Sequence, residues 1–232
     1  MTHSHLTTVF LVTLLGSLFS NTVTAANNGG VGLSATRMIF PLSASEERMG
    51  VKNTSDKNVF LMQSWMTDER GNKTTDFVIT PPLFVLKPGK EGSLRVTKAR
   101  SQPLPSDRES LYYLNSKAIP SADKAHPQGN SILQIATQSI IKVFVRPAGL
   151  KMTSKEAPDN VSCRLADGHL SLRNNSPYYI TLVNLHIDGN PLKNTMVAPF
   201  SSVTQSVTKG KGVVTLQTVN DYGAITPTQM CK

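Results

Sequence analysis

The chain has 232 residues, of which 24 are Lys or Arg and 15 are Asp or Glu, giving a formal net charge of +9. The basic residues are scattered and include no run of five, so the charge does not indicate a nucleic-acid-binding tail. The length suffices for two domains of roughly 100 residues each, and beyond residue 25 no apolar stretch could span a bilayer.

Residues 1–25 have the pattern of a secretory signal. An apolar run over residues 9–19 is followed by Thr22–Ala25, where small residues at Val23 and Ala25 suit cleavage after Ala25. No Lys or Arg precedes the apolar run, which leaves a membrane anchor as the alternative. The apolar run of about a dozen residues is too short to span well, so cleavage is favoured. The mature chain would then begin at residue 26.

Residues 26–147 contain about seven short apolar runs separated by turn residues, and none shows a helical period. This spacing predicts a β-sandwich domain of immunoglobulin-like size. We expect the first strand to run through residues 31–40, with one apolar row that Arg37 interrupts. The other predicted strands are 49–53, 59–66, 77–79 with 83–86, 92–96, 111–115 and 131–146.

The last of these strands has two halves. Leu133 and Ile135 alternate with polar or small residues, and Thr137 continues their row with a smaller side chain. From Ile140 onward both faces are apolar, except for Lys142. One interpretation is a core strand whose lysine reaches solvent. The other is a strand that offers its alternating side chains to another protein, with Lys142 holding an acidic group.

A second β domain is predicted for residues 148–232, after a hinge at Ala148–Leu150. Its expected strands are 161–165, 169–173, 178–183, 196–198, 203–207 and 213–219. The only two cysteines, Cys163 and Cys231, both lie here. An even count in an exported chain indicates one disulfide, with two buried thiols as the alternative.

The sequence contains little that indicates catalysis. The histidines of the mature chain are isolated from one another and from the cysteines, which argues against a zinc or copper site. No nucleophile elbow or phosphate-binding glycine loop is present, and the carboxylates Asp107 and Glu109 flank an arginine in a charged loop. An enzyme is therefore disfavoured, and no cofactor is expected.

Three cations remain inside apolar strands, namely Arg37, Lys142 and Arg146. Burying an unpaired cation costs several kcal/mol, so each requires an acidic partner. That partner belongs either to this chain or to another molecule.

The motifs resemble, in order along nearly the whole mature chain, those of the periplasmic chaperones of the chaperone–usher pilus pathway. They are residues 36–40 (TRMIF), 80–84 (TPPLF), 86–89 (LKPG), 104–115 (LPSDRESLYYLN) with Ile119–Pro120, 133–136 (LQIA), 141–147 (IKVFVRP) and 220–224 (NDYGA).

The resemblance implies two immunoglobulin-like domains in a boomerang arrangement. It further implies a chaperone that lends an edge strand to incomplete pilus subunits and delivers them to an outer-membrane usher. Leu133, Ile135 and Thr137 would enter the subunit, while Arg37 and Lys142 would bind its C-terminal carboxylate. A charge network between the domains would consist of Glu109, Arg146 and Asp221.

Three positions depart from the family pattern. Thr137 is smaller than the usual apolar residue, Ser116 replaces an aliphatic one, and Lys142 differs in parity from Leu133, so that a bulge or twist is expected between them. The short loop 121–130 and the absence of a cysteine pair in the first domain resemble the short-loop subfamily.

Two further expectations concern partners. A secreted immunoglobulin-like adhesin or fibre subunit is the alternative, although such a subunit would be one incomplete sandwich with a free extension. The row of Leu133 and Ile135 is also an aggregation hazard in the free protein. We therefore expect the free protein to shield it through weak self-association along that edge, which a Leu133→Glu substitution would abolish.

Overall fold

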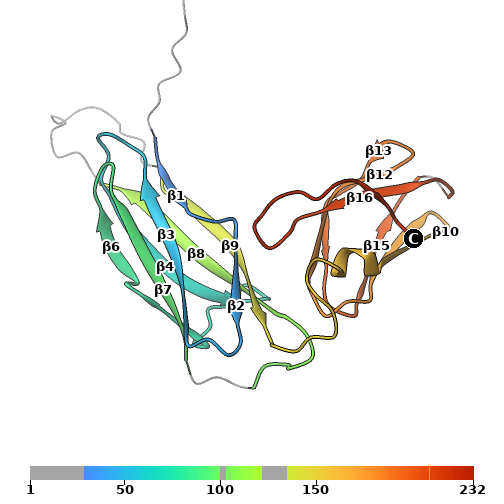
Figure 1. The fold of residues 1–232 in the computed structure, drawn as a ribbon. Coiled ribbons are helices and arrows are strands. Elements are labelled where there is room, and N and C mark those ends of the chain that lie inside the picture. The colour runs from blue at the N-terminus through green and yellow to red at the C-terminus, as the bar shows by residue number, and fades with distance from the viewer. Residues whose placement is uncertain (1–28, 100–102, 122–134, 209) are drawn as a thin grey trace, which may run out of the picture.

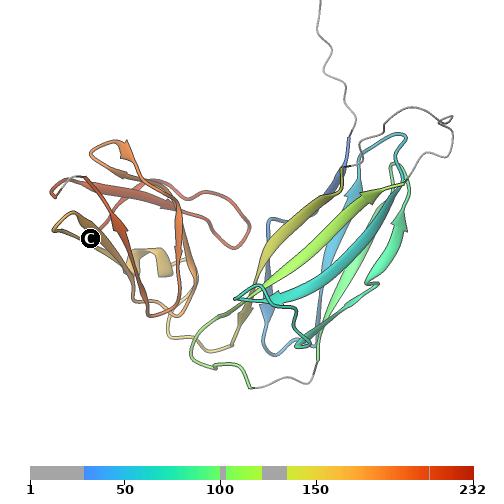
Figure 2. The ribbon, with the colours of Figure 1, turned by 180° about the vertical axis from the view of Figure 1, so that it is seen from behind.

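The computed structural model describes residues 29–99, 103–121, 135–208 and 210–232, and the regular secondary structure of this part of the chain is nearly all β. Two β-sandwiches meet at one end and diverge at the other, as Figures 1 and 2 show from opposite sides. The predicted all-β class, with two immunoglobulin-like domains in a boomerang arrangement, is confirmed. No helix in the described part is long and apolar enough to cross a membrane. The predicted signal and Leu133 lie outside the described residues.

The first domain consists of a four-stranded and a five-stranded sheet. The smaller sheet is antiparallel and has the order β1 (Val31–Leu33), β3 (Glu46–Asn53), β7 (Glu91–Lys98), β5 (Phe77–Thr80). The larger has the order β2 (Arg37–Pro41), β9 (Thr137–Arg146), β8 (Ser110–Pro120), β4 (Phe60–Asp68), β6 (Leu83–Leu86), with β2 and β9 parallel. Period-two apolar side chains from both sheets, such as Leu94 and Leu114, form one core between them.

The predicted single strand over residues 31–40 is wrong, because the chain changes sheets in its middle. β1 pairs with β3 of the smaller sheet, and after a break at residues 34–36 the chain continues as β2 beside β9 of the larger sheet. The parity of the apolar row changes at this break, so that Met38 and Phe40 are buried in the core. Arg37 accordingly lies on the outer face rather than in the core row.

The sheet change leaves part of β9 without a neighbour. β8 pairs with β9 from Thr137 to Val145, but β2 pairs with it only from Lys142 onward. Among the described residues, the other edge of β9 is therefore unpaired from Thr137 to Ile141. An unpaired edge presents free N–H and C=O groups on which another strand can be added.

The expected bulge is not present in the described part of β9. Its register with β8 runs without a shift, and alternate residues therefore face opposite sides. Ile141 and Val143 face the core on the same side as Thr137, whereas Ile140 and Lys142 face outward. Ser116, which replaces an aliphatic residue of the family pattern, is buried. It accepts a hydrogen bond from Ser64 Oγ at 3.2 Å, which gives its hydroxyl a partner inside the sheet.

The second domain has its own core, formed by residues such as Leu172, Leu182 and Leu216. Its three-stranded sheet has the order β10 (Val161–Ala166), β11 (His169–Asn174), β15 (Ser202–Ser206). The five-stranded sheet has the order β13 (Asn190–Pro191), β12 (Ile180–Ile187), β16 (Val214–Thr218), β17 (Gln229–Met230), with β14 (Thr195–Val197) beside β12. A short 3₁₀ turn, η2 (Ala157–Asn160), precedes β10.

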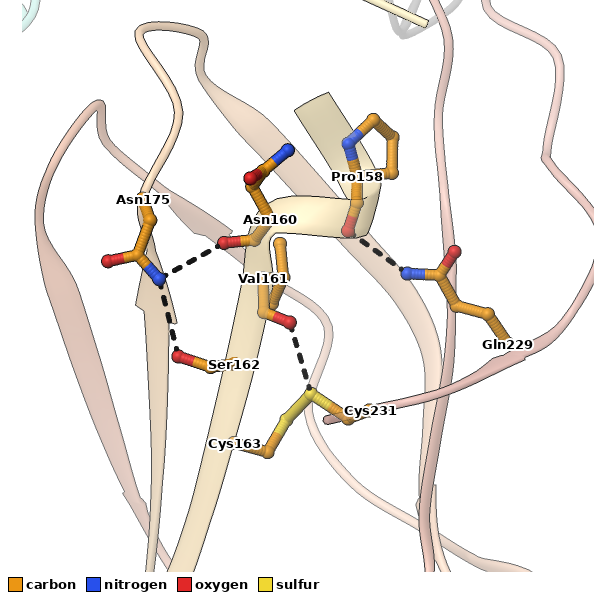
Figure 3. Close-up of a disulfide and its surroundings, with 8 residues drawn as sticks. All are labelled: Pro158, Asn160, Val161, Ser162, Cys163, Asn175, Gln229 and Cys231. Atoms are coloured by element: carbon orange, nitrogen blue, oxygen red, sulfur yellow. Dashed lines mark hydrogen bonds between the residues drawn. A yellow bond between two sulfur atoms is a disulfide. The ribbon is translucent and has the colours of Figure 1, made fainter. Parts of the chain in front are cut away.

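Cys163 and Cys231 form a disulfide that fastens the end of the chain to β10 (Figure 3). Backbone hydrogen bonds support this link, because Cys163 N donates to Lys232 O and Cys231 N donates to Val214 O, each at 2.9 Å or less. The loop that the disulfide closes spans 68 residues. In the chain-entropy model such a loop contributes about 4 kcal/mol to stability.

Candidate functional site

A cleft with a volume of about 340 Å³ lies between the two domains. The first domain contributes side chains from β2 and β9, among them Arg37 and Phe144, and the second contributes Tyr178, Tyr179 and the segment 218–222. Parallel pairing sets Arg37 of β2 directly beside Lys142 of β9, at the point where the unpaired edge of β9 ends. The structure therefore brings both predicted cations together at the cleft.

Arg37 is held in the cleft by contacts that do not neutralise its charge. Its Nη1 donates to Val219 O at 3.2 Å, its Nε is buried without a partner, and its guanidinium lies 6.0 Å from the centre of the Phe144 ring. Burial lowers the pKa of Arg37, and the charge of Asp221 offsets only part of this effect. An unsatisfied donor on a buried cation favours an added acceptor.

Lys142 is in a similar state. Its Nζ donates to Thr181 Oγ1 of the second domain at 3.4 Å, and no carboxylate among the described residues forms an ion pair with it or with Arg37. Burial and the neighbouring charge of Arg37 both lower its pKa. Two half-buried cations therefore lie side by side, and their mutual repulsion would be relieved by an added anion.

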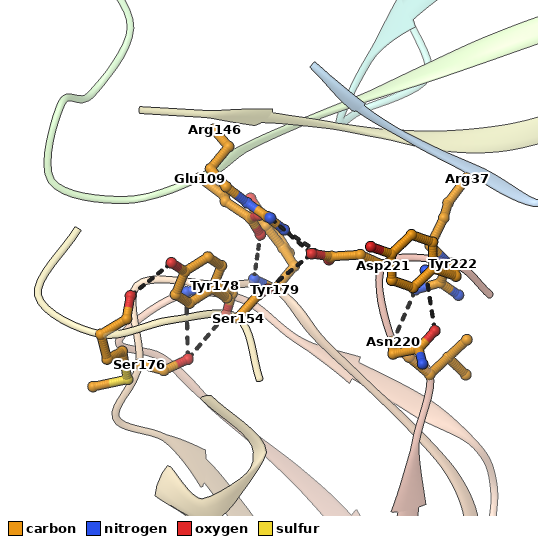
Figure 4. A network of polar contacts seen from close by, with 12 residues as sticks. Arg37, Glu109, Arg146, Ser154, Ser176, Tyr178, Tyr179, Asn220, Asp221 and Tyr222 are labelled. Carbon is orange, nitrogen blue, oxygen red and sulfur yellow. Dashed lines mark hydrogen bonds and ion pairs between the residues drawn. The ribbon is translucent and has the colours of Figure 1, made fainter. Parts of the chain in front are cut away.

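Arg146, in contrast, is fully paired within the chain. Its Nε donates to Glu109 Oε1 at 2.7 Å, and its two terminal nitrogens donate to the two carboxylate oxygens of Asp221 at 2.8 and 2.7 Å (Figure 4). Glu109 also accepts from Tyr179 N, and Asp221 from Ser154 Oγ, each at 2.8 Å. The network therefore joins Arg146 and Glu109 of the first domain to Ser154, Tyr179 and Asp221 of the second domain.

Arg146, Glu109 and Asp221 shift one another's pKa values. Burial alone would lower the pKa of Arg146, but its hydrogen bonds to Asp221 and the charge of Glu109 raise it overall. Burial raises the pKa of Glu109, and Arg146 offsets part of that rise. For Asp221 burial acts upward as well, yet the hydrogen bonds from Arg146 and Ser154 hold its pKa below the ordinary value.

We expect Asp221→Asn to loosen the domain junction and to remove part of the acid sensitivity of the protein. A carboxyl with a lowered folded-state pKa stabilises the fold above its ordinary pKa of about 3.9, and this contribution disappears as the pH falls through the lowered value. Wild type should therefore lose about 1 kcal/mol more stability than Asp221→Asn between about pH 4 and pH 2 in urea unfolding.

Asp159→Asn, which alters an exposed carboxylate of η2, is the matched control and should follow the wild-type curve. If wild type and Asp221→Asn lose stability in parallel over that range, the network does not stabilise the junction.

The tip of the segment 219–226 touches the first domain directly. Gly223 has a φ of +86°, and a Cβ atom there would lie 2.3 Å from Thr36 Oγ1, so only glycine fits. Val219, whose carbonyl oxygen accepts from Arg37, begins the same segment. The sequence motif at 220–224 marked this segment, but it did not reveal Val219, Thr181 or Tyr179 as partners of the cleft.

The strand residues predicted to bind a partner are placed in part. Ile135 is 67% exposed and Thr137, the first residue of β9, is exposed too, so both are available along the unpaired edge. No group of three metal-ligating side chains occurs among the residues that the structure describes. The site thus combines a free strand edge with a paired-cation pocket, which is the arrangement of a protein that binds an extended polypeptide.

Comparison with known proteins shows the family to which the chain belongs. Residues 30–151 match the family described as "Pili and flagellar-assembly chaperone, PapD N-terminal domain", and residues 156–230 match "Pili assembly chaperone PapD, C-terminal domain". The chain therefore belongs to the family of pilus-assembly chaperones. The matches do not favour the alternative of an adhesin or fibre subunit.

Individual relatives support this membership. The chain is 42% identical over 227 residues to the probable fimbrial chaperone protein ElfD of Escherichia coli strain K12, covering 97% of this chain and 95% of ElfD. It is 43% identical over 199 residues to the E. coli chaperone protein FocC, covering 85% and 87%. The crystal structure of the periplasmic chaperone SfaE superposes with a TM-score of 0.76 at 41% identity, covering 87% of this chain and 99% of SfaE.

Proposed function

We propose that this chain is a periplasmic chaperone that binds, folds and caps pilus subunits by lending them β9, and that delivers them to the outer-membrane usher. It acts as a binding protein without catalytic activity. We further propose that residues 1–25 are a signal peptide removed on export. The domains then comprise residues 26–147 and 148–232.

The observation that carries this proposal is the edge of β9. It is unpaired from Thr137 to Ile141 and becomes paired at Lys142, where Arg37 starts β2. The two adjacent cations and the end of the free edge therefore coincide. A strand added to this edge would end at the two cations.

The geometry also favours one direction for the added strand. β9 runs toward the cleft, and β2 continues along the same edge in parallel to it. A guest strand whose C-terminal carboxylate reaches Arg37 and Lys142 must run the same way as β9. It would then occupy the edge that β2 leaves free, and charge-assisted hydrogen bonds to the carboxylate would fix its register.

An extension of β9 back to residue 135 would place Ile135 on the same side as Thr137, two residues away. Once a guest strand is hydrogen-bonded beside them, these side chains face the interior of the guest, where alternate pockets can accept them. Main-chain hydrogen bonds give this interaction its affinity, and the alternate side chains give it selectivity.

Hydrogen–deuterium exchange of the mature protein with and without a cognate subunit tests this function. Backbone amides in the 135–141 peptide should exchange quickly in the free protein and at least about tenfold more slowly in the complex, because the edge becomes paired. The peptide covering β3 should be unaffected. Equal exchange of the 135–141 peptide in both states would contradict strand lending.

A further inference from the structure

A second contact between the domains lies beside the hinge, and its two side chains, Arg108 and Phe200, do not line the cleft. The guanidinium of Arg108 in the first domain lies 4.9 Å from the centre of the Phe200 ring in the second. This distance is within the range of a cation–π interaction. Neither residue belongs to the charge network around Arg146.

Phe200 has a conformation that its own domain does not explain. Its φ of +54° lies in the left-handed region, which is unfavourable for a bulky residue. The side chain remains 44% exposed, so core packing does not account for it either. The backbone N–H of Phe200 donates to Ser176 O at 3.2 Å, which holds the ring next to the turn that faces the first domain.

The other half of the contact is oriented in advance. Arg108 Nε and Nη2 donate to the two carboxylate oxygens of Asp107 at 3.0 and 2.8 Å, which fixes the plane of the guanidinium. The next residue, Glu109, donates its backbone N–H to Pro177 O at 2.9 Å. The segment 107–109 therefore contacts the second domain at two neighbouring points: Glu109 binds the turn at Ser176–Pro177, and Arg108 lies against the ring of Phe200.

Packing between the domains is incomplete near the hinge. A hollow of about 430 Å³ lies there, lined by Asp107, the hinge residues Gly149–Met152, Pro177 and Phe200 among others. Gly149 has a φ of +73°, as expected where a chain turns sharply. Because few packed atoms resist a change in the size of this hollow, directional contacts at its rim can contribute to holding the angle.

We propose that Arg108 and Phe200 are positioning residues that clamp the hinge and so fix the interdomain angle at which Arg37 and Lys142 face the second domain. The clamp adds to the charge network, whose Glu109 directly follows Arg108 in the chain. Its consequence for affinity rests on the proposed function, whereas its consequence for the angle belongs to the free protein.

Phe200→Gly distinguishes loss of the clamp from loss of stability. It should loosen the contact between the domains while leaving the second domain as stable as before or more stable. Glycine removes the ring but adopts a positive φ without strain, so the second domain should melt at the same temperature or higher. Residual dipolar couplings of the free mature protein should show that the two domains no longer share one alignment. Subunit affinity should fall about threefold, as the loss of an exposed cation–π contact implies.

Further variants identify the contact itself. Phe200→Tyr should keep the wild-type alignment and affinity, since it retains the ring. Arg108→Gln should loosen the domains as Phe200→Gly does, and the double variant should add nothing further. A fixed domain orientation in Phe200→Gly overturns the proposal, and so does a loosened orientation with unchanged affinity. Neither result bears on strand lending, which the exchange of the 135–141 peptide tests separately.

Discussion

Arg37→Ala and Lys142→Ala are each expected to lower the affinity for a pilus subunit at least about 30-fold while leaving the free protein folded. Removing one member of a partly buried, hydrogen-bonded charge pair costs about 2 kcal/mol or more. The incoming carboxylate would lose one of its two cations and would lie in the cleft incompletely paired. Co-purification of the cognate subunit from periplasm, followed by titration of the purified variants, measures the loss.

The same substitutions should not weaken the free protein, which distinguishes a binding site from an internal salt bridge. Both cations are half-buried without a carboxylate partner among the described residues, so their charge opposes folding. Lys142→Met, which keeps most of the apolar stem, should be as stable as wild type or more stable in urea.

The lowered pKa of Lys142 gives this expectation a definite pH dependence. The folded state releases the proton of Lys142 at a lower pH than the unfolded state, whose pKa is about 10.4. The free energy of unfolding of wild type should therefore rise relative to Lys142→Met as the pH increases toward that value.

Lys52→Ala, which alters an exposed side chain on β3 of the smaller sheet, is the matched control for charge loss and should retain full subunit binding. Unchanged subunit recovery with both Arg37→Ala and Lys142→Ala would mean that these cations have only a structural role.

The sequence was sufficient to predict the fold and to single out the strand cations, because both depend on local patterns. Period-two apolar runs between turn residues define the strands of both sandwiches, and a cation inside such a run is conspicuous in any β protein. Arg37, Lys142 and Arg146 were visible for this reason. Which of them has an acidic partner was not visible. The folded chain shows that Arg146 forms ion pairs with two carboxylates, whereas Arg37 and Lys142 form none with the described residues.

The sheet change at residues 34–36 could not be predicted for a related reason. A strand that switches partners keeps an extended backbone on both sides of the break, so the residues themselves continue to look like one strand. The change of sheet is decided by two strands that are far apart in sequence: β3 pairs with β1, and β9 pairs with β2. The same non-local pairing creates the free edge of β9, which is the functional feature.

Contacts between the domains were the least predictable part of the site. Val219 O and Thr181 Oγ1 are ordinary polar atoms of a β domain, and nothing in their sequence neighbourhood indicates that cations lie beside them. Phe200 carries no sequence signal for its positive φ either. These features arise from the angle between two domains, which depends on a few contacts spread over the whole chain.

The lent strand itself is tested by two isoleucines that differ mainly in the face they occupy. Ile135 and Ile140 are 67% and 58% exposed. A lent strand that continues β9 with period two back to residue 135 would place them on opposite faces. We expect Ile135→Ser to lower subunit affinity about 10- to 100-fold, because burying an isoleucine in a guest pocket contributes about 1.5–3 kcal/mol. Ile140→Ser, the control of identical chemistry, should change affinity less than about threefold.

Thr137 provides the complementary gain of function. If its smaller side chain leaves a guest pocket partly empty, Thr137→Ile should strengthen subunit binding by up to about tenfold, since each added buried methylene contributes roughly 0.8 kcal/mol. Isothermal titration of the purified variants with a cognate subunit measures all three effects. Equal losses for the Ile135 and Ile140 variants would contradict the alternation on which strand lending depends, because a strand inserted by one face cannot be equally sensitive on both.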